Sequence, residues 1–367
     1  MNNFPSVPSK HDTILLIVTL LLLTVGITMI YSSSSIPALE RYKDGLYFLK
    51  RQFFYILLGL ISMMILRKTS YQKLGKFAYL GLGISVVCLV LLFVPHLGVK
   101  VNNATRWLRL GLFNFQVTEL VKVAIVLFLA HYLAKKEINR QDFKQGFLIP
   151  LCVTLFIMAL ILRQPDFGTA VIIGMIMLSM LFLSGARIRY LAGLVALLLP
   201  LAVWQVVRSD YRWERLKTML NPWNDPLGTG FQIIQSFISF GAGGPFGVGI
   251  GDGMQKLYYL PEPHTDFILS VIAEEGGFIA VAVIISLFVI FIWRGFVIAY
   301  KAPDLFGTLL AAGLTMTIAV EAFVNIAGVM GLIPVKGLAL PFVSYGGSSV
   351  VMSLVAVGIL MNISSYR

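Results

Sequence analysis

Residues 13–32 read TILLIVTLLLLTVGITMIYS, a run of twenty residues without a charge. About 20 such residues in a helix cross a bilayer core of roughly 30 Å. The run FGTAVIIGMIMLSMLFLSG at 167–185 has the same character. The chain has 367 residues, of which 58% are hydrophobic and only 13% are charged, so it lacks the polar surface of a soluble domain of this size. We therefore expect an all-α polytopic membrane protein.

The hydrophobic runs predict ten transmembrane helices. A long extracytoplasmic loop, 208–265, separates the seventh span from the eighth, and the alternating pattern of an outer-membrane barrel is absent. We treat residues 1–367 as a single integral membrane domain. The expected spans lie near 13–33, 52–66, 77–95, 119–134, 147–162, 167–185, 188–207, 266–293, 305–332 and 342–363.

The net charge of +12 comes from basic residues that lie mainly in the loops between these runs. With both termini in the cytoplasm, fourteen Lys and Arg residues fall inside and nine fall in the short outside loops. Short loops rich in Lys and Arg stay on the cytoplasmic side, so this distribution favours cytoplasmic N- and C-termini. Orientation signals and contacts with membrane lipids explain the charge better than binding to nucleic acid.

The loop 208–265 is the one large segment outside the spans. Its stretches 221–232 and 241–253 are rich in Gly and Pro, which suits tight turns and also suits a flexible linker. Between them, FQIIQSFIS predicts a short amphipathic helix.

Several ionisable residues lie within the expected spans or at their ends, where charge is costly. Glu119 and Lys122 are three residues apart on one helical face and can pair. Arg163 and Asp166 flank the turn RQPDFG and form a second candidate pair. Such groups either hold the bundle together or line a polar cavity.

The stretch LPEPHTDFILSVIAEEGG, 260–277, brings Asp266 to the start of the eighth span. Thr265 is the expected N-cap of that helix. Ser270 and Ala273 follow Asp266 on about one face, which suits the wall of a polar cavity opening outward. The residues alone equally allow Asp266 to be an acid that complements a helix N-terminus. Deeper in the span lie two further carboxylates, expected in helix contacts or in the inner part of the cavity: Glu274 and Glu275.

Five segments in this order resemble the SEDS family (shape, elongation, division and sporulation), which includes FtsW and RodA. The Lys-Gly of PVKGLALP is closer to the FtsW or sporulation type than to the RodA type, although Val117-Thr118-Glu119 departs from the usual Pro-Ser-Glu. The segments are ATRWLRLGLFNFQVTELVK at 104–122, RQPDFGTA at 163–170, GTGFQIIQSFISFGAGG at 228–244, YLPEPHTDFILSVIAEE at 259–275 and LIPVKGLALPFVSYGGSS at 332–349.

The resemblance implies a peptidoglycan glycosyltransferase that polymerises lipid II at the outer face of the bacterial cytoplasmic membrane during cell division. The essential Asp of the family falls on Asp266. The implied partners are a class B penicillin-binding protein, which is a transpeptidase, and other proteins of the division complex at the division site.

The implied reaction needs a base for the acceptor hydroxyl and positive charge for the departing pyrophosphate. We assign Asp266 as the base, with inversion at the anomeric carbon. Arg106 and Arg109 are candidates for binding the pyrophosphate, with Lys336 as a further one. A divalent cation such as Mg or Mn could share this task, with Asp266 as a metal ligand.

The remaining candidate residues fall into two groups. His264, Gln235 and Ser344 are candidate substrate-binding residues. A second set is assigned a structural or cavity-lining role: Glu119, Lys122, Gln116, Asp166, Glu274 and Asn325.

Three other functions remain open at this stage. A lipid II flippase needs a cavity and alternating access but no indispensable outward carboxylate. A non-catalytic activator of the transpeptidase should tolerate loss of Asp266. A RodA-like polymerase of cell elongation would carry out the same chemistry in another process.

Overall fold

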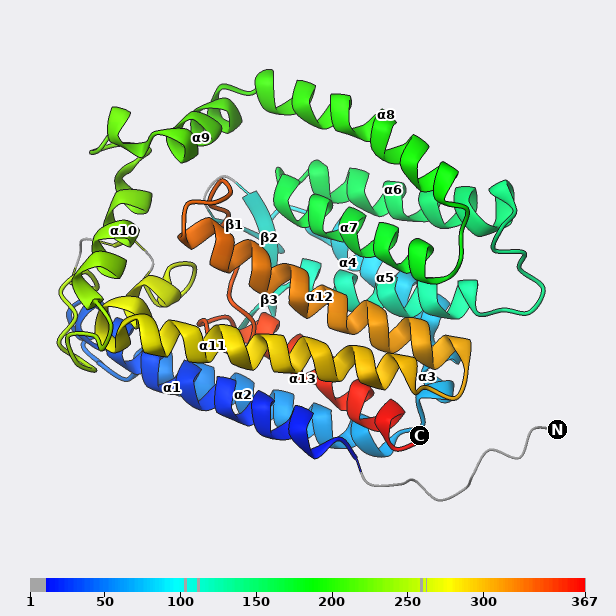
Figure 1. The fold of residues 1–367 in the computed structure, drawn as a ribbon, viewed down its shortest axis with the longest axis horizontal. Helices are drawn as coiled ribbons and strands as arrows, with labels where there is room; N and C mark the ends of the chain where they lie inside the picture. Colours follow the sequence, from blue (N-terminus) through cyan, green and yellow to red (C-terminus); the bar gives the residue numbers. More distant parts are fainter. Residues whose placement is uncertain (1–10, 102–103, 111–112, 258–259, 262, 367) are drawn as a thin grey trace.

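The computed structural model describes residues 11–101, 104–110, 113–257, 260–261 and 263–366. Every expected span coincides with a helix (Figure 1). In chain order the helices before the long loop are α1 (Thr13–Tyr42), α2 (Tyr47–Lys68), α3 (Tyr71–Lys76), α4 (Ala78–Leu91), α5 (Val117–Leu133), the π-helix η1 (Phe143–Leu148), α6 (Ile149–Leu162), α7 (Phe167–Leu183) and α8 (Ile188–Val207). They are followed by α9 (Asp210–Leu220), the 3-10 helix η2 (Pro222–Asn224), α10 (Phe231–Gly243), α11 (Ile268–Tyr300), α12 (Leu305–Val329) and α13 (Gly347–Ser364).

Seven of the described helices are long and apolar enough to cross a membrane: α1, α2, α6 with η1, α8, α11, α12 and α13. Two shorter apolar helices, α4 and α7, occupy expected spans as well. The α5 helix carries Glu119 and Lys122 in an otherwise apolar sequence. The all-α polytopic class is confirmed, and the count of ten spans stays a prediction.

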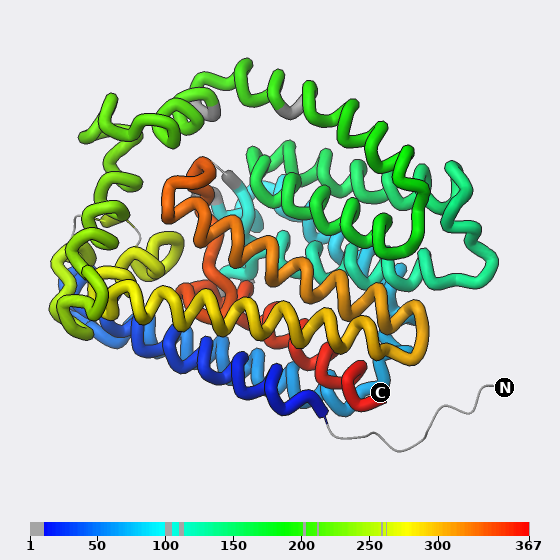
Figure 2. Tube along the Cα trace, viewed as in Figure 1, coloured from blue at the N-terminus to red at the C-terminus, as the bar shows by residue number. Residues whose placement is uncertain are grey.

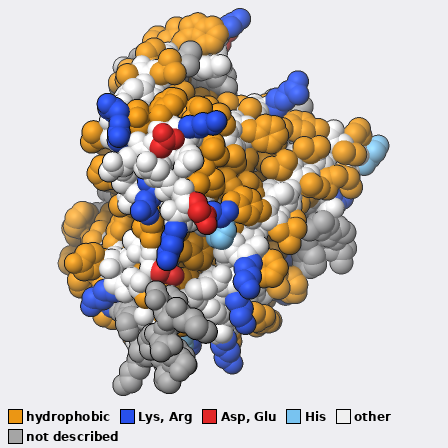
Figure 3. All heavy atoms as spheres, turned by 90° about the vertical axis from the view of Figure 1, so that its right-hand side faces the viewer, with side chains coloured by type: hydrophobic (Ala, Val, Ile, Leu, Met, Phe, Trp, Pro, Cys, Tyr) orange, Lys and Arg blue, Asp and Glu red, His pale blue; other side chains and the backbone are white. Residues whose placement is uncertain are grey.

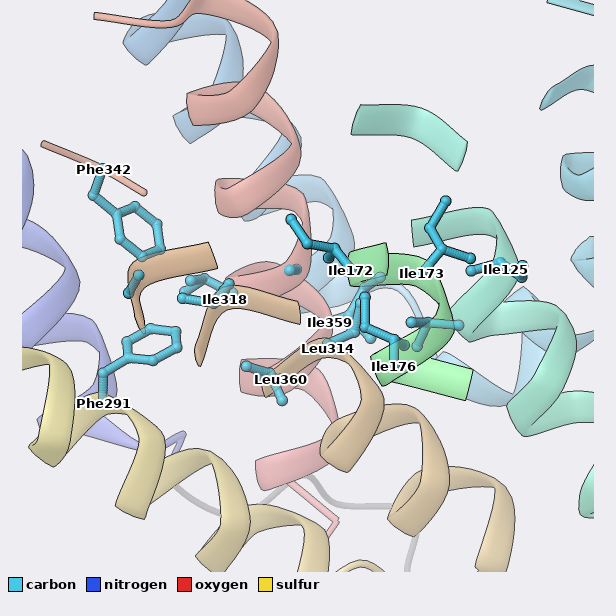
Figure 4. Close-up of a cluster of buried hydrophobic side chains, with 14 of the residues drawn as sticks. Ile125, Ile172, Ile173, Ile176, Phe291, Leu314, Ile318, Phe342, Ile359 and Leu360 are labelled. Carbon is cyan, nitrogen blue, oxygen red and sulfur yellow. The ribbon is translucent and has the colours of Figure 1, made fainter. Parts of the chain in front are cut away.

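The core of the bundle is built around α12 and α13. In the most apolar stretch of these helices 72% and 89% of the residues are buried, against 22% in α2 and 12% in α8. Figure 4 shows the centre of this core, where Ile125 of α5, Ile172 of α7, Ile318 of α12 and Leu360 of α13 lie together. A helix that is apolar all round is buried, whereas the outer helices turn apolar side chains outward to lipid.

Both ends of the described chain lie at one end of the bundle (Figure 1). Asp12 caps α1 through Leu15 N, and its own backbone N–H donates to Ser364 Oγ at 3.0 Å. Figure 3 looks onto this end, where Lys and Arg side chains gather while hydrophobic side chains cover the flanks. Exposed lysines of the two basic loops, Lys68, Lys73, Lys76 and Lys136, belong to the segments expected on the cytoplasmic side.

The opposite end holds most of the structure outside the spans. A small antiparallel sheet, not expected from the sequence, consists of β1 (Gly98–Val101), β2 (Ala104–Leu110) and β3 (Phe113–Gln116) in the order β1-β2-β3. The segment ATRWLRL does not alternate strictly between apolar and polar residues, so it lacks the period-2 pattern of a half-buried strand. This segment of about nineteen residues between two spans was assigned only as a loop because its strands are too short to give a strong signal.

The loop 208–265 is not a bare linker. The α8 helix arches away from the other helices and leads into α9 and then α10 (Figures 1 and 2). The expected amphipathic helix is confirmed as α10, which packs against α11: Ser236 and Ser270 are buried and their hydroxyls lie 2.7 Å apart. The α9 helix carries the charged sequence DYRWERLK and was not expected.

The α11 helix is interrupted at Gly277, whose φ of 67° and ψ of −169° are not helical. The break frees backbone groups of α11, and the glycine-rich segment after α10 bonds to them. Phe278 N donates to Gly244 O at 2.9 Å, and Val248 N donates to Glu274 O at 3.0 Å. A transmembrane helix tolerates such a break only where another part of the protein takes over these hydrogen bonds.

Replacing Gly277 by Ala should therefore damage the fold. A Cβ at this position would lie 2.3 Å from Gly247 N, and the backbone conformation itself is one that only glycine adopts readily. We expect Gly277→Ala to lower the free energy of unfolding by more than about 2 kcal/mol. The measurement is thermal or denaturant unfolding in detergent.

Gly83→Ala is the matched control, because a Cβ on Gly83 in α4 meets nothing within 4 Å. This control should be neutral or slightly stabilising. Equal stability of the two variants would show that the break at Gly277 is not held as described.

Candidate functional site

Asp266 lies in the short segment before α11 and not inside the helix. The helix begins at Ile268, and its N-cap is Phe267, which makes no side-chain capping hydrogen bond. The prediction that Thr265 caps α11 is therefore wrong. Asp266 is partly buried at the end of the bundle that lies opposite the basic loops.

Asn325 of α12 fixes the backbone at Asp266. Its Nδ2 donates to Asp266 O at 3.0 Å and to Leu338 O at 2.6 Å. One buried amide thus joins α12 to the segment before α11 and to the segment 331–346, which connects α12 to α13. The expected structural role of Asn325 fits these contacts.

Gly337 of segment 331–346 lies against the Asp266 carboxylate. A Cβ on Gly337 would be 2.9 Å from Asp266 Oδ2, so a larger residue would press on the carboxylate. The Lys-Gly pair of PVKGLALP therefore brings a backbone without a side chain up to this carboxylate.

Ser344 adds further contacts between the same two segments. Its hydroxyl donates to Thr265 O at 2.6 Å and accepts from Leu340 N at 2.8 Å, and the residue is buried. Tyr345 N donates to His264 O at 2.9 Å. In this position Ser344 links segment 331–346 to the residue before Asp266. Direct substrate binding by Ser344 stays a prediction.

His264 is buried between two aromatic rings. Its ring centroid lies 4.4 Å from that of Phe48 and 5.6 Å from that of Tyr345. Burial lowers the pKa of His264 to about 4, so the ring is neutral at pH 7. A role in positioning substrate would then rest on a neutral imidazole.

Arg106 of β2 pairs with Asp166, with 3.1 Å between Nε and Oδ2. Asp166 also caps α7 by accepting from Thr169 N at 3.2 Å and Thr169 Oγ1 at 2.8 Å. The prediction that Arg163 pairs with Asp166 is wrong: Arg163 is exposed, and the sheet supplies the arginine from a distant part of the chain. Asp166 thus anchors the turn RQPDFG, in line with its expected structural role.

Lys336 crosses the start of α7 from segment 331–346. A Cβ on Gly168 would lie 2.9 Å from Lys336 Cδ, and Lys336 Nζ is 5.8 Å from the Phe167 ring centroid. Burial lowers the pKa of Lys336, and the charge of Asp166 opposes that shift. The chain therefore places the cationic residue Lys336 next to Gly337, which contacts Asp266.

Arg106 and Arg109 differ in their surroundings. Both belong to β2, where Arg106 lies at the irregularity in the pairing with β1, whereas Arg109 pairs with Asn114 of β3. Arg106 turns to Asp166, whereas Arg109 is exposed. Binding of the pyrophosphate by Arg106 and Arg109 stays a prediction, and the pairing with Asp166 gives Arg106 a structural role as well.

Glu119 and Lys122 form the expected pair, with 2.8 Å between Oε1 and Nζ. Lys122 also donates to Glu321 of α12. All three residues are buried, so one ammonium lies between two carboxylates from two helices. Gln116 lies at the junction of β3 and α5, and its backbone N–H donates to Ser348 Oγ of α13 at 2.9 Å.

Glu274 and Glu275 are buried and hold the glycine-rich segment, in line with their expected structural role. Glu274 accepts from Met254 N at 2.8 Å. Glu275 accepts from Lys256 Nζ at 2.6 Å and from Ser32 Oγ of α1 at 2.7 Å. Sequence reasoning missed Lys256, because its partner lies 19 residues away and no spacing rule connects them.

The face of α11 below Asp266 does not open into a polar cavity. Ser270 is buried against Ser236, and Ala273 is 2% exposed. The expectation of a cavity wall is wrong because α10 packs onto this face. Gln235 of α10 is partly buried, and its carbonyl accepts from Ser239 Oγ at 2.9 Å.

Among the residues that the structure describes, no group of three or more His, Cys, Asp and Glu side chains could hold a metal ion. The Asp166 carboxylate is already paired with Arg106. Hard divalent cations take six or more oxygen ligands. The described part of the chain therefore shows no ready-made set of ligands around Asp266, and the expected cation stays a prediction.

Comparison with known protein families identifies the family of this chain. The model of the cell-cycle protein family that groups FtsW, RodA and SpoVE matches residues 12–367. The chain belongs to this family. It is an integral membrane protein, as the apolar helices indicate.

Several relatives of the FtsW/RodA/SpoVE family are similar over nearly the whole chain. The probable peptidoglycan glycosyltransferase FtsW of Trichlorobacter lovleyi is 46% identical, over 97% of this chain and 94% of its own. The stage V sporulation protein E of Bacillus subtilis is 42% identical, over 98% of both chains.

Solved structures share the fold. A chain from the structure titled "Structural coordination of polymerization and crosslinking by a peptidoglycan synthase complex" is 32% identical, with a TM-score of 0.80 over 96% of this chain and 97% of the other. The rod shape determining protein RodA of Thermus thermophilus is 26% identical, with a TM-score of 0.72 over 100% of both chains.

The buried Lys256–Glu275 pair predicts a clear effect on stability. Lys256→Met leaves the Glu275 carboxylate buried without its cation, which should lower the free energy of unfolding by about 3–5 kcal/mol. Adding Glu275→Gln should recover much of the loss, since a neutral amide needs no counter-charge. Unfolding in detergent measures both variants.

Lys50→Met is the matched control, because the Lys50–Asp44 pair is exposed. Exposed pairs of this kind contribute little, so no measurable change is expected. If the double variant were no more stable than Lys256→Met, charge burial would not be the cause.

His264 predicts a dependence of stability on pH. Its pKa in the folded chain is about 4, below the usual value of about 6.5, so between these values only the unfolded chain takes up the proton. Stability should therefore fall as pH falls from about 6.5 to about 4, with a loss of about 3 kcal/mol from this residue. In His264→Gln this share of the pH dependence should vanish, as thermal unfolding at both pH values would show; an unchanged pH dependence would contradict the assignment.

Proposed function

We propose that the chain is a peptidoglycan glycosyltransferase that polymerises lipid II at the outer face of the cytoplasmic membrane. The observation that carries the proposal is the convergence at Asp266, where Asn325, Gly337 and Ser344 hold the segment around one carboxylate. The family membership and the names of the relatives support the same activity.

In the proposed reaction, the sugar hydroxyl of one substrate attacks the anomeric carbon of a lipid-linked sugar. The new glycosidic C–O bond forms as the bond to the undecaprenyl pyrophosphate breaks. Asp266 takes the proton of the attacking hydroxyl as general base. A single displacement inverts the configuration at the anomeric carbon.

Lys336 is our candidate for stabilising the departing pyrophosphate. It is the cation that lies beside Gly337, and its partial burial strengthens its interaction with a phosphate oxygen. Arg106 instead holds Asp166 and with it the turn over which Lys336 lies. Arg109, which is exposed on β2, remains a candidate for contacts with phosphate. A divalent cation at Asp266 would take most of its ligands from the pyrophosphate.

The expected topology fits this activity. Cytoplasmic N- and C-termini put the basic loops inside, and Asp266, the sheet and residues 208–265 outside. The transpeptidase partner is supported by the similarity to a chain of a peptidoglycan synthase complex. Relatives named for division and for sporulation are almost equally similar, and we favour division on the FtsW names.

The decisive experiment is polymerisation of lipid II by the purified chain with its cognate transpeptidase. Asp266→Asn keeps the size of the side chain but cannot take the proton, so the rate should fall at least about 10²-fold. Gel analysis of the glycan strands measures the rate. Asp252→Asn, an exposed carboxylate of the same outer loop, is the control and should polymerise normally.

Two results would reject the proposal in different ways. Normal polymerisation by Asp266→Asn would remove Asp266 as the base. A wild-type complex that forms no strands but moves lipid II across a vesicle membrane would favour a flippase, and one that only activates the transpeptidase would favour a scaffold.

A further inference from the structure

A groove of about 500 Å³ lies between α4 and α6 on the outside of the bundle. Its size is within the range of ligand sites, roughly 300–1,000 Å³. None of the residues that line it belongs to the site around Asp266. On α4 the lining residues follow the spacing of one helical face: Tyr79, Leu82, Gly83 and Val86.

The groove is lined almost entirely by apolar side chains and opens outward. Cys152 and Phe156 of α6 form its second wall and are exposed, whereas Ile157 beside them is 1% exposed. A Cβ on Gly83 would meet nothing within 4 Å, so the described part of the chain leaves the space next to this glycine open. An exposed apolar groove of this kind on a membrane protein is a surface for lipid or for another membrane helix.

A cation lies at one end of the groove. Tyr79 is the lining residue nearest to the start of α4, and its hydroxyl accepts from Lys135 Nζ at 2.8 Å. The Tyr79 ring packs edge-on against Phe128 and His131 of α5, with 5.7 Å between ring centroids in both pairs. An ammonium group has three N–H donors, and the bond to Tyr79 uses one of them. Lys135 can therefore donate to a further acceptor at this end of the groove.

The end of the bundle at which Lys135 lies is basic. The loops 67–76 and 135–146 carry four Lys and Arg residues each, against two carboxylates in both loops together. Figure 3 shows Lys and Arg side chains gathered at this end. Tyr and Lys residues at the end of an apolar helix mark the level of the lipid headgroups. The end of the groove at Tyr79 therefore lies where lipid phosphates are found.

The length of the groove favours a lipid chain over a second transmembrane helix. From Tyr79 to Val86 the α4 helix rises about 10 Å. One leaflet takes up about half of a hydrocarbon core of roughly 30 Å, so the groove stays within one leaflet. A partner helix would pack along the whole span, whereas an acyl chain runs from its headgroup into its own leaflet.

We propose that this groove binds an anionic phospholipid of the leaflet on the side of the basic loops. One acyl chain lies between α4 and α6, and the phosphate accepts a hydrogen bond from Lys135. The lipid thereby joins α4, α6 and the loop that follows α5. Binding of this lipid does not depend on the proposed glycosyltransferase activity.

The test counts bound lipids by native mass spectrometry of the purified full-length protein in detergent. Dioleoyl phosphatidylglycerol is anionic and dioleoyl phosphatidylcholine has no net charge, but their acyl chains are the same. We expect the first phosphatidylglycerol to bind about fivefold more tightly than the first phosphatidylcholine. Lys135→Gln should remove this preference. Lys136→Gln, a change at the neighbouring exposed lysine, is the matched control and should keep it.

The acyl chain is tested by filling the groove. Gly83→Leu places a side chain where several methylene groups of the acyl chain would lie, so the first molecule of either lipid should bind at least about tenfold more weakly. Gly81→Leu is the matched control, because a Cβ there also meets nothing within 4 Å but Gly81 does not line the groove. Cys152→Leu fills the groove from α6 and should act as Gly83→Leu does. Thermal unfolding shows which variants are folded, and the Cys152 variant decides the test if the Gly83 variant is not.

Each of the following results would overturn the proposal. They are equal binding of the two lipids by the wild type, a preference for phosphatidylglycerol that survives in Lys135→Gln, normal lipid binding by a folded groove variant, and an equal loss of binding in Gly81→Leu. A dimer mass that disappears in Gly83→Leu but not in Gly81→Leu would assign the groove to a second copy of the chain instead.

Discussion

The interruption of α11 at Gly277 is the constraint on which the outer end of the molecule depends. A membrane interior offers no water to the backbone groups that such a break sets free. Four hydrogen bonds between residues 244–249 and the two sides of the break satisfy these groups: Val248 and Gly249 donate to α11, and Gly244 and Pro245 accept from it. The glycine-rich segment is therefore a fixed part of the bundle. Because it is fixed, Glu274 and Glu275 can reach its backbone and hold the segment that leads on to Asp266.

Buried charges, like buried backbone groups, need partners within the protein. Lys122 lies between the carboxylates of Glu119 and Glu321, and Lys256 lies against Glu275. The Lys122–Glu321 and Lys256–Glu275 pairs each join two different elements of the chain. A buried pair adds little net stability to the folded state. The main effect of these pairs is therefore to fix the relative positions of the elements that they join. They set how α5 packs on α12 and how the outer loop packs on α1 and α11.

The sequence predicted the helices well because an apolar run of about 20 residues crosses a bilayer as a helix, which satisfies all its backbone hydrogen bonds. It also predicted the Glu119–Lys122 pair, because three residues of helix set the distance between them. It failed where partners are distant in the chain. Asp166 was assigned to Arg163, its neighbour, whereas its partner Arg106 comes from a strand of a sheet that the short segments did not reveal. Lys256 was missed for the same reason.

The sequence could predict that Asp266 belongs to a site, but it could not predict the geometry of that site. Helix periodicity placed the carboxylate on the first turn of α11, above a face of small residues. In the structure that face packs on α10, and Asp266 lies in the turn before α11, where Asn325 donates a hydrogen bond to its carbonyl. Because the backbone carries these hydrogen bonds, the carboxylate can be positioned without a helix behind it. Gly337 then leaves the carboxylate beside a backbone that has no side chain, and this is the space that the attacking hydroxyl of the proposed reaction would need.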